Sequence, residues 1–404
     1  MIDTSDLGDP GPGKHLLTVN GGSSSIKFAL FESDGACRRV LTGAIDRIGS
    51  PEATFSVKDS VPSERMSRPV DAQDHKAAVE VLMDWIDGRR DNLVAVGHRV
   101  VHGGPKYFLP QRVTPEMIDD LRGYRSFDPE HLPEEILLAE VFHHRFPELP
   151  QVACFDTAFH QYMPQVARML PIPRRYQASG VRRYGFHGLS YESILAELGR
   201  IGEPVASKGR AILAHLGNGA SLAAVRDGRS MDTSMGFTPA GGIPMGTRSG
   251  DLDPGLAGYL QRTEGLDAKG WNEMVHLRSG LLGISETSSD MRDLLEHEAA
   301  DPRAAEAIEL FCYQARKWIG AYAAVLGGLD ALVFAGGVGE NAPLVRERIC
   351  DGLGFLGIEL DPDRNSANEA LISTSSARVM VRIVHTDEES VIAATVRRVL
   401  ASGN

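Results

Sequence analysis

The sequence predicts an α/β protein built from two related halves. Residues 16–31, LLTVNGGSSSIKFALF, place two apolar runs around a tight cluster of Asn, Gly and Ser. The same order of apolar run, Gly/Asn/Ser turn and apolar run returns at residues 210–229, RAILAHLGNGASLAAVRDGR. Apolar runs that flank such turn-forming residues are typical of β-hairpins. A single repeat at this distance indicates two related domains rather than a solenoid, whose period is shorter.

Length and composition agree with a globular protein of this kind. The chain has 404 residues, of which 42% are hydrophobic and 24% are charged, and this length suggests two or three domains. The formal net charge of −12 argues against a general nucleic-acid or anionic-membrane binder, although a small anionic substrate can still bind in a local basic pocket. No apolar stretch reaches membrane-spanning length.

The N-terminus and the cysteines indicate the compartment. Residues 1–14 lack a basic region followed by an apolar core, so we expect a disordered tail rather than a secretory signal. The four cysteines lie far apart and form no CxxC pair, which is typical of reduced thiols in a cytosolic protein. The expected location is therefore the cytoplasm.

In the first half, strands with one intervening helix extend to about residue 110. The segment VAVGHRVVHGG (94–104) predicts a buried strand that enters a glycine-rich turn. The segment QVACFDTAFH (151–160) predicts a short apolar strand that delivers Asp156 at its end. Arg99 lies inside the first of these strands, so it must find a partner or line a pocket.

Helices follow these strands. Thr114, Pro115 and Glu116 supply an N-cap, a proline at the first helical position and an acidic first turn. Residues 132–142, LPEEILLAEVF, predict a further helix. Residues 306–326 carry apolar side chains at helical spacing, and the face that we expect to be buried comprises Ile308, Phe311, Ala315, Trp318, Tyr322 and Val325.

The chain ends in a strand, a glycine-rich turn and a helix. ALVFAGG (331–337) predicts the strand, and GVGEN predicts the turn. Thr386 and Glu389 form a capping box that starts the terminal helix. The capping box accounts for Glu389 and leaves Glu388 for another role, the alternative being a partner of the helix dipole.

Three strand-to-glycine junctions therefore occur, at 16–25, 212–221 and 331–341. Glycines allow the backbone to approach a ligand closely and to point successive N–H groups at an anion. One such junction is usually only a hairpin, but three in one chain favour phosphate binding. In a strand after the first turn, Ser23, Ser25 and Lys27 fall on one face, which suits a phosphate; a solvated polar turn is the alternative.

Two further segments carry basic side chains among glycines. RRYGFHGLS (182–190) contains His187, and PMGTRSGDLDP (244–254) contains Arg248. Arginines from separate segments that converge on one anion would bind a carboxylate or a phosphoryl group, whereas an ordinary ion pair is the alternative for each.

Several motifs are excluded. Gly8 to Lys14 nearly forms a Walker A loop, but His15 stands where Ser or Thr is needed and no strand precedes it. His98 and His102 have the spacing of a zinc helix, but the Glu is missing and the segment has strand character. GVGENA (337–342) resembles a dinucleotide fingerprint without the strand that should follow it. No GxSxG elbow supports a serine hydrolase.

Eight segments in one order carry a resemblance to a known family. They are NGGSSSIKF, GHRVVHGG, FDTAFH, YGFHGLS, HLGNGASL, PMGTRSGDLDP, AGGVGEN and TDEES. From about residue 16 to the C-terminus, the sequence resembles the acetate kinases, a family of short-chain acyl kinases. The resemblance implies two duplicated actin-like ATPase domains, each ribonuclease H-like, with a nucleotide cleft between them, as in sugar kinases, Hsp70 and actin.

The resemblance also implies boundaries and a reaction. The first domain would comprise 15–156 with the C-terminal helix 387–404, and the second, 157–386, would carry the nucleotide site and the interface of a homodimer. The implied reaction is ATP + acetate ⇌ ADP + acetyl phosphate with Mg²⁺ or Mn²⁺, and no nucleic acid or membrane takes part. The acceptor, a carboxylate, is already ionised near neutral pH, so no base has to remove a proton from it. Asp156 is therefore expected to position magnesium or its waters.

Carried over motif by motif, the family implies four groups of site residues. They are the catalytic positions Asp156, His187 and Arg248; the acid-binding positions Arg99, Val101, Phe186 and Pro239; the metal positions Asn20 and Glu388; and the ATP-binding positions Ser23, Ser25, Lys27, His215, Leu216, Gly217, Asn218, Gly219, Asp290, Met291, Arg292, Gly337, Val338, Gly339, Glu340 and Asn341.

Two departures from the family pattern concern the acid. RSFDPEHLPEE (125–135) replaces a segment like LAPLHNP and puts Glu130 where a Leu helps to form the apolar acyl pocket, and TPAGG (238–242) replaces TPLEG. A propionate or butyrate kinase is therefore an alternative. A nucleotide-binding module without an acid acceptor and an NAD-dependent dehydrogenase are more distant alternatives, distinguishable by acid-dependent ADP release and by NAD binding.

Overall fold

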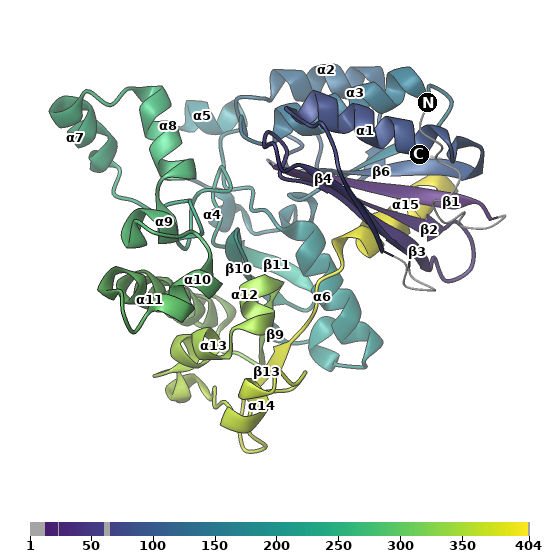
Figure 1. The fold of residues 1–404 in the computed structure, drawn as a ribbon. Helices are drawn as coiled ribbons and strands as arrows, with labels where there is room; N and C mark the ends of the chain where they lie inside the picture. Colours follow the sequence, from purple (N-terminus) through teal and green to yellow (C-terminus); the bar gives the residue numbers. More distant parts are fainter. Residues whose placement is uncertain (1–12, 23, 60–64, 403–404) are drawn as a thin grey trace. The chain divides into compact units, whose positions relative to one another are not determined.

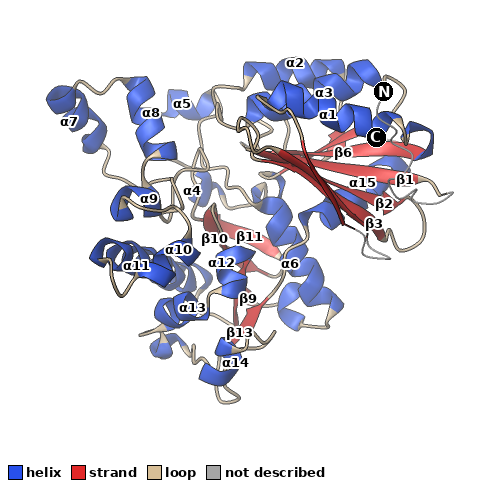
Figure 2. Cartoon of the chain, in the orientation of Figure 1, coloured by secondary structure: helices blue, strands red, loops and turns tan. Residues whose placement is uncertain are grey.

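The computed structural model describes residues 13–22, 24–59 and 65–402 (Figure 1). The chain divides into two compact units: unit 1 is Met1–Ala158 with Asp387–Asn404, and unit 2 is Phe159–Thr386. Each unit is built around a mixed β-sheet with helices packed on it (Figure 2). Among the described residues, no helix is both long and apolar enough to cross a bilayer.

Unit 1 contains a sheet whose strands run in the order β5-β4-β3-β2-β1-β6-β8-β7. Strands β1 to β5 pair antiparallel with one another, β6 pairs parallel with both β1 and β8, and β7 pairs antiparallel with β8. The strands are β1 (His15–Gly21), β2 (Ser25–Glu32), β3 (Arg39–Asp46), β4 (Thr54–Asp59), β5 (Arg65–Pro69), β6 (Leu93–Val100), β7 (Gln111–Arg112) and β8 (Gln151–Phe155).

The helices of unit 1 cover both faces of this sheet. On one face, Leu138 and Phe142 of α3 pack in the same core as Leu17 and Val19 of β1. On the opposite face lies α15, because a Cβ added at Gly97 would lie 2.4 Å from its Ile392. As predicted, Thr114 caps α2, with Pro115 as its first residue. The helices are α1 (His75–Asp87), α2 (Pro115–Gly123), α3 (Leu132–Arg145) and α15 (Glu388–Ala401), and a 3₁₀ turn covers Arg90–Asn92.

Unit 2 repeats the central part of this sheet. Its strand order is β11-β10-β9-β12-β13, with antiparallel pairing across the first three strands and parallel pairing across the last three. In unit 1 the strands β3-β2-β1-β6-β8 have the same pairing, so the duplication predicted from the two hairpins is present. The strands are β9 (Arg210–Leu216), β10 (Ala220–Arg226), β11 (Arg229–Thr233), β12 (Ala331–Ala335) and β13 (Met380–Ile383).

Helices make up most of the rest of unit 2 (Figure 1). The longest of those described is α11, which packs against α9 and α13. The helices are α4 (Gln165–Arg168), α5 (Arg174–Ala178), α6 (Gly188–Arg200), α7 (Gly255–Glu264), α8 (Ala268–Leu277), α9 (Gly280–Ser285), α10 (Met291–His297), α11 (Pro302–Leu326), α12 (Gly336–Asn341), α13 (Pro343–Cys350) and α14 (Pro362–Ser366), and 3₁₀ turns lie at Ala158–His160, Pro204–Ala206 and Gly354–Leu356.

Three local predictions were wrong. The segment GVGEN is part of the short helix α12 rather than a turn. Asp387, not Thr386, caps α15, because its carboxylate accepts from the backbone N–H of Ser390. On α11, Val325 is 47% exposed, and the buried face continues instead through Ile319 and Leu326, since the 3.6-residue period turns Val325 away from the core.

Candidate functional site

In unit 1, three predicted site residues lie at one edge of the sheet. Because β1, β6 and β8 are parallel neighbours, their carboxyl ends share that edge. Asn20 lies near the end of β1, Arg99 near the end of β6, and Asp156 directly after β8. The backbone N–H of Asp156 donates to the carbonyl of Val100 at 2.9 Å, which fixes Asp156 beside the end of β6.

The Arg99 guanidinium is held by three side chains. Its Nε and Nη2 donate to Oδ2 of Asp156 at 3.1 and 2.6 Å, and its Nη1 donates to Asn20 Oδ1 and to Glu135 Oε1, each at 3.4 Å. Burial alone would lower the pKa of Arg99, but the carboxylates of Asp156, Glu135 and Glu388 together raise it above its ordinary value. Arg99 is therefore a permanent cation at the edge of the sheet.

Glu135 is a site residue that the sequence reasoning missed. It is 2% exposed, and its Oε2 accepts the backbone N–H of Val101 at 2.7 Å while its Oε1 faces Arg99. Burial raises the pKa of Glu135 well above its ordinary value, with the charges of Asp128 and Asp156 acting in the same direction. The helical spacing of Leu132, Glu135 and Phe142 on α3 could have revealed it, because this spacing puts Glu135 on the buried face.

Glu388 adds a second carboxylate near Asp156. It is the first residue of α15, and its Oε2 accepts from Nδ2 of Asn20 at 3.4 Å. Burial raises the pKa of Glu388 to about 7, and the negative charge of Asp156 adds to this, while Arg99 and Lys27 oppose it. The smaller part of the upward shift, which comes from Asp156, reflects repulsion between the two carboxylates.

The edge of the unit 1 sheet fits a divalent cation. Oδ1 of Asp156 is buried and has no hydrogen-bond partner in the described part of the chain, and a cation beside it would also relieve the repulsion from Glu388. Mg²⁺ in nucleotide sites is usually held by one or two carboxylates together with waters and phosphates. Asn20 turns its amide nitrogen toward Glu388 and its oxygen toward Arg99, so in this orientation it does not ligate a metal directly.

The remaining predicted residues of unit 1 are placed as follows. Ser25 and Lys27 lie on the same side of β2, where Lys27 is exposed, while Ile26 and Phe28 between and after them are buried. Ser23 lies outside the described residues. Val101 is buried beside Glu135. His98 bonds the side chain of Gln151.

In unit 2, His187 lies at the N-terminus of α6. Its backbone is left-handed, with φ 58°, and this conformation turns the chain from the YGF segment into the helix. Its Nδ1 lies 2.9 Å from Oγ of Ser221, and its ring packs against that of His215 with centroids 4.4 Å apart and a tilt of 33°. His215 in turn bonds Oγ of Ser190 through Nδ1 at 2.7 Å.

His187 and Arg248 meet at Gly219. A Cβ at Gly219 would lie 3.2 Å from His187 Nε2 and 3.5 Å from Arg248 Nη1, so the missing side chain leaves room for both basic groups beside the β9–β10 turn. Arg248 Nη1 also donates to the carbonyl of Pro239 at 3.3 Å. Phe186 is buried next to His187, and its carbonyl bonds Nε2 of His160 at 3.1 Å.

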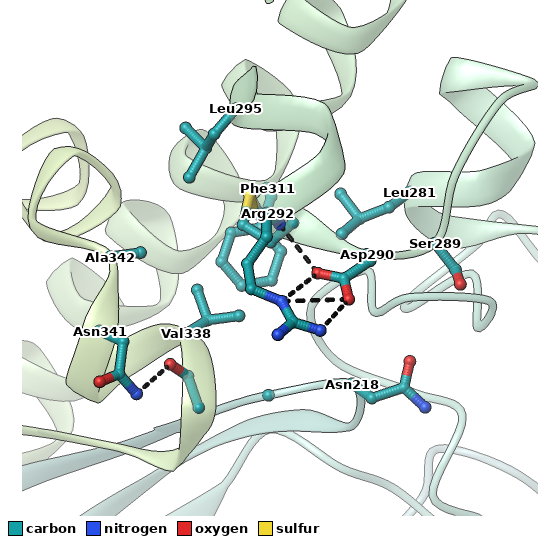
Figure 3. Close-up of a pocket in the computed structure, with 13 residues that line it drawn as sticks. Asn218, Leu281, Ser289, Asp290, Arg292, Leu295, Phe311, Val338, Asn341 and Ala342 are labelled. Carbon is teal, nitrogen blue, oxygen red and sulfur yellow. Dashed lines mark hydrogen bonds and ion pairs between the residues drawn. The ribbon is translucent and has the colours of Figure 1, made fainter. Parts of the chain in front are cut away.

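A pocket of about 590 Å³ opens beside this turn, within unit 2 (Figure 3). Figure 3 shows Asn218 on one side and Asn341 and Val338 of α12 on another, with Asp290 and Arg292 above them. Arg292 pairs with Asp290, its Nη2 lying 2.5 Å from Oδ2. The lining comprises the predicted residues Gly217, Asn218, Asp290, Met291, Arg292, Gly337, Val338 and Asn341, and the unpredicted residues Leu281, Ser289, Leu295, Phe311 and Ala342.

The other predicted ATP-binding residues of unit 2 do not line this pocket: His215, Leu216, Gly219, Gly339 and Glu340. The carboxylate of Glu340 instead accepts from the backbone N–H of Gly336 at 3.0 Å and bonds His385, so it supports the start of α12. Gly336 itself, with φ 76°, passes so close to the carbonyl of Leu216 that a Cβ would lie 2.7 Å from it.

A buried arginine that sequence reasoning missed also supports α12. Arg346 is fully buried, and its Nη1 donates to the carbonyl of Gly339 at 2.9 Å while its Nε donates to Asn365 at 2.8 Å. Burial lowers the pKa of Arg346 to about 10. No sequence signal distinguishes this arginine from one on the surface.

Comparisons with known proteins agree with these features. Residues 15–394 match the Acetokinase family. The chain belongs to the acetokinase family. It is 43% identical over 396 residues to an acetate kinase of Rhodopseudomonas palustris, covering 96% of this chain and 99% of that protein. It is 41% identical over 392 residues to a propionate kinase of Citrobacter rodentium, covering 95% and 96%.

Solved structures of acetokinase relatives have the same fold. The acetate kinase of Porphyromonas gingivalis matches with a TM-score of 0.85 at 36% identity, covering 96% of this chain and 100% of that one. A propionate kinase of Francisella tularensis matches with a TM-score of 0.88 at 35% identity, covering 95% and 98%. This family member is thus a kinase with the duplicated actin-like fold, and the relatives include both acetate and propionate kinases.

Proposed function

We propose that this chain is an acetate kinase, which transfers the γ-phosphoryl group of ATP to acetate and gives acetyl phosphate and ADP, reversibly. The observation that carries the proposal is the pocket of unit 2, lined by Gly217 and Asn218 of one hairpin and by Gly337, Val338 and Asn341 of α12. These backbone groups follow the two junctions at which the sequence predicts phosphate binding. The pocket volume of about 590 Å³ is within the range of small-molecule sites.

The acceptor needs no general base. A carboxylic acid has a pKa of about 4, so acetate is already an anion near neutral pH. One carboxylate oxygen forms a bond to the γ-phosphorus while the bond from that phosphorus to the β–γ bridging oxygen breaks, in line, and ADP leaves. What the protein must supply is positive charge, because an anion has to approach a polyanion.

Arg99 is the group that we assign to the acid. It is a permanent cation, and its fork geometry matches planar carboxylates. Its hydrogen bonds to Asp156 and its contact with Glu135 hold the guanidinium in one orientation. Val101 from unit 1, and Phe186 and Pro239 from unit 2, are the apolar residues that we assign to the acyl group.

Arg248 and His187 are the groups that we assign to the transferring phosphoryl. Both lie beside Gly219, at the turn that leads into the nucleotide pocket. Backbone N–H groups near this turn, a guanidinium and an imidazole are all donors to phosphoryl oxygens. Lys27 and Ser25 on β2, with Ser23, are also assigned to the phosphates.

Asp156 and Glu388, with Asn20 acting toward a bound water, are the residues that would hold Mg²⁺ or Mn²⁺. When bound, the ion supplies charge that offsets the phosphate oxygens. The unpartnered Oδ1 of Asp156 supports this assignment. Asp156 thereby positions the ion and Arg99 at once and removes no proton from acetate.

A hydroxamate assay tests the proposal directly. The enzyme is mixed with ATP, MgCl₂, acetate and hydroxylamine, and trapped acetyl phosphate is measured together with ADP. We expect ADP release to require acetate and to match hydroxamate one to one. ADP release that does not depend on any acid would instead indicate a nucleotide-binding ATPase, and NAD binding without ADP release would indicate a dehydrogenase.

A propionate kinase is the second candidate, since relatives of that name are nearly as similar as the acetate kinases. Glu130 is half-buried, and its backbone N–H donates to Asp128 at 3.2 Å, so the segment with the unusual acyl-pocket sequence is held by a buried carboxylate. Comparing kcat/KM for acetate, propionate and butyrate decides between them. A higher value for propionate would replace acetate as the proposed substrate.

We also propose that the enzyme is a homodimer that works in the cytoplasm, where ATP is available. Exposed apolar side chains between residues 162 and 176 support the dimer: Tyr162 is 67% exposed, Val166 82% and Ile172 44%. Light scattering after size exclusion should give twice the chain mass of 43.7 kDa. A mass of one chain at micromolar concentration would refute the dimer.

A further inference from the structure

Three side chains in unit 2 form a buried hydrogen-bonded chain that ends on His187. The hydroxyl of Tyr191, on the first turn of α6, lies 2.5 Å from Oγ of Ser221 on β10. The same Oγ lies 2.9 Å from Nδ1 of His187. Tyr191 and Ser221 are both 0% exposed, so water does not compete for these hydroxyl groups.

Only one direction of donation is favourable along these three hydrogen-bonded side chains. The Tyr191 hydroxyl has Ser221 as its one hydrogen-bond partner within the residues that the structure describes. If Ser221 donated to Tyr191, the tyrosine proton would be buried with no acceptor, which is costly. Tyr191 therefore donates to Ser221, and burial raises the pKa of Tyr191, which keeps that proton in place. Ser221 then donates its own proton to Nδ1 of His187.

The surroundings of the His187 ring also disfavour a second proton on it. The ring of His215 packs against it at 4.4 Å between centroids, and Nη1 of Arg248 lies near the same side of Gly219 as Nε2 of His187. His215 belongs to β9 and Arg248 to the 244–254 loop. Like charges at this range oppose an imidazolium. The Nε2 edge faces the β9–β10 turn, 3.2 Å from where a Cβ of Gly219 would be.

We propose that Tyr191 and Ser221 are positioning residues that hold His187 as a neutral imidazole with its proton on Nε2. His187 then acts on the ligand as a hydrogen-bond donor of fixed direction, and Arg248 carries the positive charge. The assignment of the proton to Nε2 rests on the hydrogen-bond geometry alone. The donation of that proton to a phosphoryl oxygen rests on the proposed kinase function.

The proton can be located without substrate. In protein labelled with ¹⁵N-histidine, two-bond ¹H–¹⁵N correlation spectra distinguish the Nε2–H tautomer, the Nδ1–H tautomer and the imidazolium, and the His187→Gln variant identifies the His187 signals. We expect wild-type His187 to remain the Nε2–H tautomer throughout the neutral range. A His187 signal with the proton on Nδ1, or an imidazolium at pH 7, would overturn the proposal.

Two variants and one control test the role of the chain of hydroxyl groups. In Tyr191→Phe, Ser221 can accept from Nδ1–H, so His187 should take up a proton at a pH higher by about one unit, a tenfold change in proton affinity. Ser221→Ala should give a mixture of the two neutral tautomers. Tyr322→Phe removes another buried tyrosine hydroxyl, one that bonds nothing among the described atoms, and should leave His187 unchanged.

The pH profile of turnover provides a separate test. If the neutral ring is the working form, Tyr191→Phe should lose turnover at the acid end of the pH profile and recover toward wild type as pH rises, with little change in KM for ATP. An unchanged pH profile together with an unchanged His187 titration in Tyr191→Phe would refute the positioning role. If wild-type protein shows no acid-dependent turnover at all, the kinase proposal fails, while the spectra still decide where the proton lies.

Discussion

We expect Glu135→Gln to change the pH dependence of stability in unit 1. The free energy of unfolding of the variant, measured relative to wild type, should increase as pH rises. Glu135 is buried against Arg99 and the backbone of Val101, and burial raises its pKa well above the ordinary value. A carboxyl group whose pKa is raised in the folded state contributes its full stability below the unfolded-state pKa, near 4.5. That contribution is lost as pH rises through the folded-state pKa.

The size of the effect follows from the contacts. The Gln amide oxygen can still accept the Val101 N–H, so near pH 5 the variant should differ from wild type by less than about 1 kcal/mol. As pH rises, only wild type has to bury an ionised carboxylate, and the difference grows by at most about 1.4 kcal/mol per pH unit. Glu135→Ala, by contrast, leaves the buried Val101 N–H without an acceptor and should cost about 1–3 kcal/mol even at pH 5.

The assay is urea unfolding without ligands at several pH values from 5 to 8, followed by the fluorescence of Trp85. This tryptophan is in the core of unit 1, and Trp271→Phe with Trp318→Phe removes the signal of unit 2. The matched control is Glu134→Gln, the neighbouring residue on α3, whose carboxylate is half-buried 3.8 Å from His75. Its effect should stay within about 0.5 kcal/mol at every pH.

A constant loss of stability in Glu135→Gln from pH 5 to 8 would refute this reasoning. It would mean that the ion pair with Arg99 outweighs the cost of burying the carboxylate. Glu388, which also titrates in this unit, is present in both proteins, so its contribution cancels in the difference.

Three further predictions concern the site. Arg248→Ala should lower kcat by about 10²–10³-fold, because the guanidinium lies beside the β9–β10 turn next to His187. Near-full turnover in this variant would remove Arg248 from the phosphoryl site. Gly219→Ala should lower kcat at least about tenfold, because the new Cβ would lie 3.2 Å from His187 Nε2. ATP binding, measured by calorimetry, should be retained. An unchanged kcat would contradict this prediction. In the absence of metal, the free energy of unfolding of Glu388→Gln should increase relative to wild type as pH rises through about 7, by at most about 3 kcal/mol, because the pKa of Glu388 is raised in the folded protein. Urea unfolding at several pH values measures this difference, and a difference that decreases with rising pH would contradict the prediction.

The features that could be predicted from sequence are those with a local cause. The alternation of Ile26 and Phe28 with Ser25 and Lys27 fixed the direction of the β2 side chains, and Thr114 with Pro115 marked the start of α2. The two hairpins indicated a duplication that the order of strands in both sheets confirms. Family resemblance supplied the residue roles, which stay predictions.

The features that were missed depend on contacts between distant segments. Glu135 becomes a partner of Arg99 only when α3 packs on β6, and Arg346 is buried only because α13 lies against α12 and α14. The start of α15 was wrong by one residue, because Thr386 and Asp387 are both good caps and sequence alone does not choose between them. The GVGEN segment has the composition of a turn, yet the carboxylate of Glu340 and the buried Arg346 hold it as a helix.

The return of the chain to unit 1 through α15 affects how the protein can be made. Leu16 and Gly97 lie on the sheet face that Ile392 and Val396 of α15 cover, yet α15 is synthesised only after unit 2. On a ribosome adding about 5–20 residues per second, that apolar face would wait roughly ten to fifty seconds while unit 2 is translated. The nascent chain thus holds an incomplete first domain that needs protection from aggregation, and Glu388 joins the rest of unit 1 only after unit 2 has been translated.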